Sequence, residues 1–302
     1  MRNLPIILYL VVYALVLASM HLESGFDLAE PLIVLLVFGL GLSLLAVWTT
    51  RPVTPRNITV KRPGQECAAL AGYSIILVSF ITWGLPAVRG ISAEPLTQAI
   101  LVTAAKLLVF VIVPFALWRS IWRYQFGDFV DLRAGLSRHW KAFVVLSLAL
   151  LAIQAFLGRA RADLAVLQPS TFEMLLAVGV TFPWLFLEAG IVEEYFFRGL
   201  VQVRMAALLR SEVAGLVVMA LIFGLAHAPG LYLRPEATGE ALGAHPSLLT
   251  AIGYSIVVTS AAGFFLGVLW IRTRNLLLLS LVHAVGDLLP NLADTTHLWR
   301  PT

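Results

Sequence analysis

Residues 31–49 read PLIVLLVFGLGLSLLAVWT, an uncharged apolar stretch long enough to cross the hydrocarbon core of a bilayer as a helix. Eight other stretches of similar length and mostly apolar composition accompany it along the chain. The nine stretches lie at 4–20, 31–49, 68–87, 98–117, 141–157, 172–191, 213–229, 250–271 and 275–290. Their number and length predict a multi-pass membrane protein.

The overall composition supports the same conclusion. Hydrophobic residues make up 60% of the chain and the mean hydropathy is +0.90, both far above the values of soluble globular domains. A helix satisfies its own backbone hydrogen bonds in lipid, and the alternating pattern of a membrane β-barrel is absent. The sequence therefore predicts an all-α, polytopic membrane helix bundle with about nine transmembrane helices, within a range of eight to nine.

The polar stretches between these spans are too short to fold into a soluble domain with a core of its own. We divide the chain by function at residue 140. Residues 1–140 are expected to be accessory helices with a basic loop, and residues 141–302 a bundle that carries the polar motifs. The single cysteine, Cys67, excludes an intrachain disulfide framework and a multi-cysteine metal site.

Lysine and arginine are unevenly distributed among the segments that connect the spans. If the N-terminus is cytoplasmic, most of the 21 basic residues lie on the cytoplasmic side, chiefly in segments 50–67 and 118–141. This predicts a cell-membrane protein with a cytoplasmic N-terminus and an outside C-terminus. The net charge of +4 then reflects that asymmetry and contact with anionic lipid headgroups, and no nucleic-acid partner is expected.

Glu193 and Glu194 stand side by side in the segment IVEEYFFRGL, residues 191–200. A carboxylate at membrane depth is costly, and therefore indicates a functional site. On a helix the two side chains point about 100° apart, so their roles should differ. Glu194 and Arg198 have the i,i+4 spacing of an ion pair, which leaves Glu193 as the carboxylate available to take and return protons.

Two histidines and an aspartate supply the next polar groups. His227 lies in the following span, and an antiparallel hairpin with its turn near 210–212 brings it level with Glu193, provided that the first helix continues to about residue 209. His283 and Asp287, in the last span, share a face because they are four residues apart. The four side chains come from three spans and can converge on one cavity.

Each of these groups also has a purely structural interpretation. A single membrane histidine often hydrogen-bonds another helix, which applies to His227 and to His283. The Glu194–Arg198 pair can simply stabilise the bundle, and Asp287 can orient the imidazole of His283. We interpret Pro183, Trp184 and Glu188, which precede the glutamates on the same helix, as packing, a kink or outer-face polarity.

Three ordered motifs carry a resemblance to a known family. They are Glu193-Glu194-x-x-x-Arg198, Phe223-x-x-x-His227 and His283-x-x-x-Asp287. Their order and spacing, within residues 170–290, resemble the CAAX protease and bacteriocin-processing family, the Abi-type glutamic intramembrane proteases that include CAAX prenyl protease 2. The first four spans lie outside the resemblance.

The resemblance implies a peptidase without an obligatory metal. Carried over by position, Glu193 would be the general base, His227 would share activation of the water, and His283 would donate a hydrogen bond to the oxyanion. Asp287 stands where the prenyl proteases carry asparagine. An ionised aspartate only accepts hydrogen bonds, so Asp287 must be protonated or serve to orient His283. The substrate would be a membrane-associated protein or peptide, such as a prenylated C-terminus, a sorting tail or a bacteriocin precursor.

Two alternatives stay open beside the metal-free protease. Two histidines with one or two carboxylates can form a three-ligand zinc site with an open position, although a helical His-Glu-x-x-His pattern is absent. A nonproteolytic membrane scaffold, immunity factor or carrier could use the same polar cluster to bind a ligand or to move protons. The sequence carries no signal for the oligomeric state.

Overall fold

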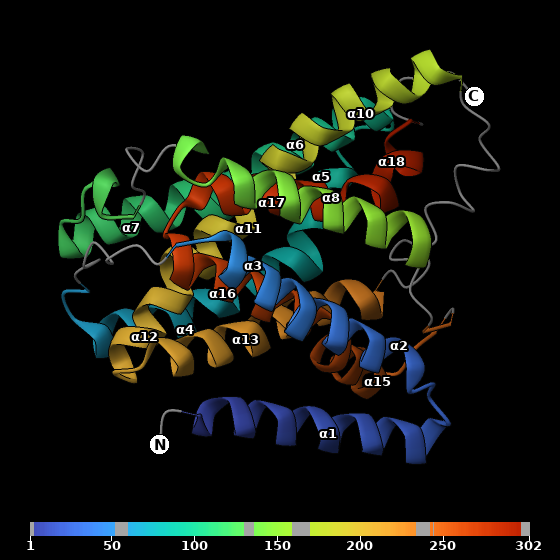
Figure 1. Ribbon diagram of the computed structural model, residues 1–302. Helices are drawn as coiled ribbons and strands as arrows, with labels where there is room; N and C mark the ends of the chain where they lie inside the picture. The colour runs from blue at the N-terminus through green and yellow to red at the C-terminus, as the bar shows by residue number, and fades with distance from the viewer. Residues whose placement is uncertain are drawn as a thin grey trace. The chain divides into compact units, whose positions relative to one another are not determined.

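The computed structural model describes residues 3–51, 60–129, 136–158, 170–233, 242–243 and 245–296, and the regular elements within them are all helices (Figure 1). Within these residues, eight helical runs are long and apolar enough to cross a membrane. They are Leu4–Ser24, Ala29–Thr49, Pro63–Arg89, Pro95–Trp122, Trp140–Leu157, Thr171–Leu208, Glu212–Leu233 and Leu248–Thr273. The predicted all-α polytopic membrane bundle is confirmed, at the lower end of the predicted range.

The ninth predicted span, 275–290, is not among these eight runs, because it contains a break between two short helices. They are α17 (Leu276–Gly286) and α18 (Leu288–Thr296). The 11 residues of α17 rise only ~16 Å, about half of a hydrocarbon core of ~30 Å. The cytoplasmic location of the N-terminus and the outside location of the C-terminus stay predictions.

The helices form two compact units that interleave along the sequence. The first contains Met1–Gly84 and Phe197–Arg272, and the second contains Leu85–Phe196 and Thr273–Thr302. Each unit takes residues from both sides of position 140, where we divide accessory helices from the bundle that carries the motifs. That functional division stays a prediction.

The first unit has an apolar core in which α1 (Leu4–Ser24) contributes one face. Tyr9, Tyr13, Leu17 and Met20 lie on this face at helical spacing and are buried against residues of α13 (Glu212–Leu233) and α15 (Leu248–Tyr254). The other segments of this unit are α2 (Ala29–Val34), η1 (Leu35–Leu42), α3 (Ser43–Thr49), α4 (Pro63–Ser79), η2 (Phe80–Gly84), α12 (Val203–Leu208), η8 (Ser255–Thr259) and α16 (Ser260–Thr273).

In the second unit, α8 (Trp140–Leu157) lies along α17 (Figure 1), and α10 (Thr171–Leu185) packs on α18. Leu185, Ala284, Leu288 and Leu292 are buried in the apolar core of this unit. Its other segments are α5 (Leu85–Arg89), α6 (Pro95–Leu107), η3 (Leu108–Ile112), α7 (Val113–Trp122), η4 (Phe126–Asp128), η5 (Leu136–Arg138), η6 (Phe186–Ile191) and α11 (Val192–Glu194). The helix η7 (Tyr195–Gln202) follows α11 and leads into α12.

Candidate active site

The helical run Thr171–Leu208 carries both adjacent glutamates. It continues far beyond the apolar stretch 172–191, as the predicted depth match between Glu193 and His227 requires. The segments η6 and η7, on either side of the glutamates, are π-helical. Four other segments of the structure, η1, η2, η3 and η8, are π-helical as well, so this geometry does not by itself mark a site.

Gly190 allows α17 to approach this run closely. A Cβ atom at Gly190 would lie 2.5 Å from the carbonyl oxygen of Ser280, so no larger residue fits without a backbone shift. His283 follows Ser280 by three residues, and the two glutamates follow Gly190 by three and four. The close approach therefore places the imidazole opposite the glutamates.

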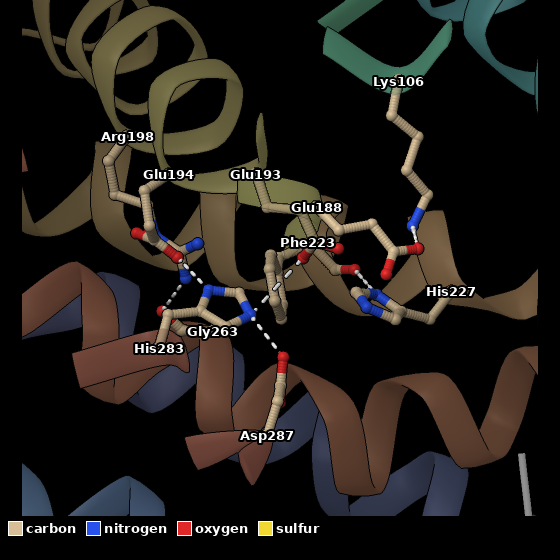
Figure 2. A network of polar contacts seen from close by, with 10 residues as sticks. All are labelled: Lys106, Glu188, Glu193, Glu194, Arg198, Phe223, His227, Gly263, His283 and Asp287. Atoms are coloured by element: carbon tan, nitrogen blue, oxygen red, sulfur yellow. Dashed lines mark hydrogen bonds and ion pairs between the residues drawn. The ribbon is translucent and has the colours of Figure 1, made fainter. Parts of the chain in front are cut away.

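His283 is surrounded by three carboxylates (Figure 2). Its Nδ1 atom lies 2.6 Å from Oε1 of Glu194, and its Nε2 atom lies 3.3 Å from Oδ2 of Asp287 and 3.8 Å from Oε2 of Glu193. The imidazole is itself buried, with 8% of its side chain exposed. The structure thus places three predicted site residues, Glu193, Glu194 and Asp287, around a fourth, His283.

The three carboxylates differ in exposure, as the angle between the adjacent glutamates predicts. The side chain of Glu194 is 0% exposed, whereas those of Glu193 and Asp287 are 20% and 37% exposed. Glu194 is therefore placed to hold the imidazole from the interior. Glu193 and Asp287 are the two less enclosed carboxylates of the cluster.

Arg198 and Phe223, two predicted supporting residues, contact each other in the first unit. The guanidinium carbon of Arg198 lies 4.4 Å from the centroid of the Phe223 ring, and Arg198 Nη2 donates to the carbonyl oxygen of Gly263 at 3.2 Å. Arg198 is fully buried, so the ring and the carbonyl replace part of its hydration. Glu194 bonds to His283 and Arg198 bonds to the carbonyl oxygen of Gly263. The predicted ion pair between Glu194 and Arg198 stays a prediction.

His227 lies one turn after Phe223 on α13. Its Nδ1 atom is 2.8 Å from the carbonyl oxygen of Phe223, and the centroids of the His227 and Phe223 rings are 4.8 Å apart. A carbonyl oxygen only accepts, so Nδ1 carries the proton in this bond. In the neutral imidazole Nε2 is then the basic nitrogen. The convergence of His227 with Glu193 on one water stays a prediction.

The sequence analysis missed an ion pair that joins Lys106 of α6 to Glu188 of the helical run Thr171–Leu208. Lys106 Nζ is 2.8 Å from Oε1 of Glu188 (Figure 2). Trp184 Nε1 donates to Oε2 of Glu188 at 2.9 Å. Glu188 and Trp184 are thus hydrogen-bonded to each other, beyond the packing or surface role that we inferred from sequence. The available signal was Lys106 itself, because a lysine inside an apolar span requires a partner.

Among the residues that the structure describes, no group of three or more His, Cys, Asp and Glu side chains is arranged to hold a metal ion. The cluster around His283 has one imidazole, and its short bond to Glu194 uses the ring nitrogen that faces the interior.

A comparison with known protein families matches the region that contains these site residues. Residues 174–289 match the family model Rce1-like, described as type II CAAX prenyl endopeptidase Rce1-like. The chain carries an Rce1-like domain. All seven predicted site residues lie inside this domain, and the resemblance to CAAX proteases read from the three motifs is confirmed. The protein is thus a multi-pass membrane protein with a domain of a peptidase family. No curated protein and no solved structure matches the chain.

Proposed function

We propose that the protein is an intramembrane endopeptidase that hydrolyses a peptide bond in a membrane-associated protein or peptide. The observation that carries this proposal is the cluster of Glu193, Glu194 and Asp287 around His283 within the Rce1-like domain. Amide hydrolysis needs a base for water, an acid for the leaving amine and a donor for the oxyanion. A carboxylate and two histidines can supply all three.

Glu193 is the proposed general base. Its side chain is partly exposed, in contrast to Glu194, so a water molecule can reach it. Glu193 takes a proton as the water oxygen bonds to the carbonyl carbon, and it returns that proton to the nitrogen as the carbon–nitrogen bond breaks. The basic Nε2 of His227 would accept a hydrogen bond from the same water.

His283 is the proposed oxyanion donor, and Glu194 makes that role chemically consistent. When Nδ1 donates to Glu194, the ring can also donate from Nε2 only if it carries both protons. The Glu194 carboxylate supplies the compensating negative charge for this imidazolium through a charge-assisted bond of 2.6 Å. Asp287 would accept from Nε2 before the substrate binds and so orient the ring.

The deciding experiment compares protein termini across the membrane proteome of cells that express the wild type or Glu193→Gln at equal levels. We expect new termini that depend on Glu193, which would identify the substrate and the cleavage site together. Thermal unfolding of both purified proteins controls for folding. Undiminished cleavage by the variant would overturn the proposal. If both proteomes are identical and the cellular phenotype survives Glu193→Gln and His227→Ala, a nonproteolytic scaffold, immunity factor or carrier is the better description.

We also propose that catalysis needs no metal ion, because the activating groups above are carboxylates and imidazoles. The purified protein should then cleave its substrate equally well before and after dialysis against a chelator. Stoichiometric zinc in the purified protein, together with activity that is lost to the chelator and restored by zinc, would contradict this proposal.

A further inference from the structure

The helical path after His283 is interrupted at Asp287. The helix α17 ends at Gly286 and α18 begins at Leu288, and Asp287 between them has φ −96° and ψ −7°, away from the usual helical ψ of about −42°. Pro290 accounts for part of the interruption, since it has no N–H group and its ring clashes with the carbonyl four residues earlier. The backbone next to this break needs other hydrogen-bonding partners, because lipid supplies none.

Gln154 of α8 supplies partners to the backbone at the break. Its Nε2 donates to the carbonyl oxygen of Val285 at 2.9 Å, and its Oε1 accepts from the backbone N–H of Leu289 at 2.9 Å. These two backbone groups are the ones that an uninterrupted α-helix would bond to each other. The Gln154 amide is therefore inserted into the hydrogen-bond ladder of the helix, which is a known cause of helix kinks.

The two groups that Gln154 holds lie two residues before and two residues after Asp287. The carbonyl of Asp287 is also held, because it accepts from Nδ2 of Asn291 at 2.8 Å. With its backbone fixed on both sides, Asp287 places Oδ2 at 3.3 Å from Nε2 of His283. We propose that Gln154 is a positioning residue that sets the Asp287 carboxylate on the reactive nitrogen of His283. The catalytic consequence rests on the proposed function, whereas the geometric claim can be tested without any substrate.

The test uses the full-length protein in nanodiscs with ¹⁵N-labelled histidine, and the His283 signals are assigned by their loss in His283→Gln. In Gln154→Leu we expect the Nε2 signal of His283 to shift more than the Nδ1 signal, because Nδ1 faces Glu194 on another helix. In an Asp287→Asn background, Gln154→Leu should produce little further shift, since the two residues act through one contact. A matched control is Ser147→Ala on the same helix, where the buried hydroxyl has no hydrogen-bond partner among the described residues.

Equal shifts at both nitrogens would overturn the proposal, because they would indicate general loosening of the bundle. An unchanged Nε2 signal in folded Gln154→Leu would overturn it as well. If Gln154→Leu does not fold, Gln154→Met carries the test, since its unbranched side chain removes both the donor for Val285 and the acceptor for Leu289. Failure of both variants to fold, while Ser147→Ala folds, would make Gln154 a structural residue only. None of these outcomes depends on whether Glu193→Gln abolishes proteolysis.

Discussion

His283 Nδ1 lies 2.6 Å from Glu194 Oε1, the shortest of the three carboxylate contacts that the ring makes. The second glutamate of the adjacent pair thus holds the imidazole from a fully buried position, while Glu193 stays partly exposed. The pair therefore divides into a residue that holds the ring from a buried position and a residue that is partly exposed. This division leads to different expectations for the two amide substitutions.

Glu194→Gln should lower stability, whereas Glu193→Gln should leave it nearly unchanged. Removing the charge of Glu194 replaces a buried charge-assisted bond by a weaker neutral one, which we expect to cost about 1–3 kcal/mol. The measurement is the thermal unfolding midpoint of each purified variant in nanodiscs. Equal midpoints for the two variants would contradict the assignment of Glu194 as the anchoring residue.

Gly190→Ala should disturb the site although it adds only one methyl group. The new Cβ would lie 2.5 Å from the Ser280 carbonyl oxygen, and a backbone atom cannot move aside as a side chain can. We expect destabilisation of about 1–3 kcal/mol and a longer distance between His283 and Glu194. Gly179→Ala on the same helical run is the control, because its Cβ would meet nothing within 4 Å. If the two substitutions have the same effect, close packing at Gly190 does not position α17.

Signals that are local in the chain predicted the all-helical fold and the shared face of His283 and Asp287. Apolar stretches of membrane length identify spans, and the i,i+4 spacing of His283 and Asp287 places both on one face, as found. The break at Asp287 was not predicted, because a hydropathy window does not register it. That break depends on Pro290 together with the amide of Gln154, a residue 131 positions before Val285.

The sequence analysis allowed side chains from three spans to converge, but it could not assign the individual partners across helices. The i,i+4 rule finds a partner for Glu194 only on its own helix, but His283 is 89 positions away in the chain. Likewise, Lys106 and Glu188 are 82 positions apart, and each alone looked like isolated polarity in an apolar span. Spacing rules describe one helix at a time, whereas the packing of α17 on η6 follows from a single small residue, Gly190.

Lys106 and Glu188 should show strong coupling in a double-mutant cycle. Lys106→Met removes the ion-pair partner of Glu188 inside an apolar span, and we expect a loss of about 1–3 kcal/mol, less than for a fully buried pair because the side chains are 23% and 24% exposed. Adding Glu188→Gln to Lys106→Met should recover most of that loss. Thermal unfolding of the wild type, both single variants and the double variant provides the cycle. Purely additive effects would show that the two residues do not stabilise the protein as a pair.

Glu94 should give the protein a component of stability that disappears in acid. It caps α6 from outside the spans, with Oε2 accepting from the backbone N–H of Thr97 at 2.6 Å and Oε1 from that of Leu96 at 3.1 Å. Hydrogen bonds from Thr97, reinforced by that of Leu96, outweigh desolvation and hold the pKa of the Glu94 carboxyl below its usual value of 4.5.

Because the pKa is lower in the folded state, the unfolded chain binds the proton first. The stabilisation is therefore complete above the unfolded pKa and is lost as the pH falls through the folded pKa. The difference in thermal midpoint between the wild type and Glu94→Gln should stay constant from about pH 7 to about pH 5 and shrink below that. If the difference in thermal midpoint between the wild type and Glu94→Gln does not change with pH, the charge of Glu94 does not stabilise the protein.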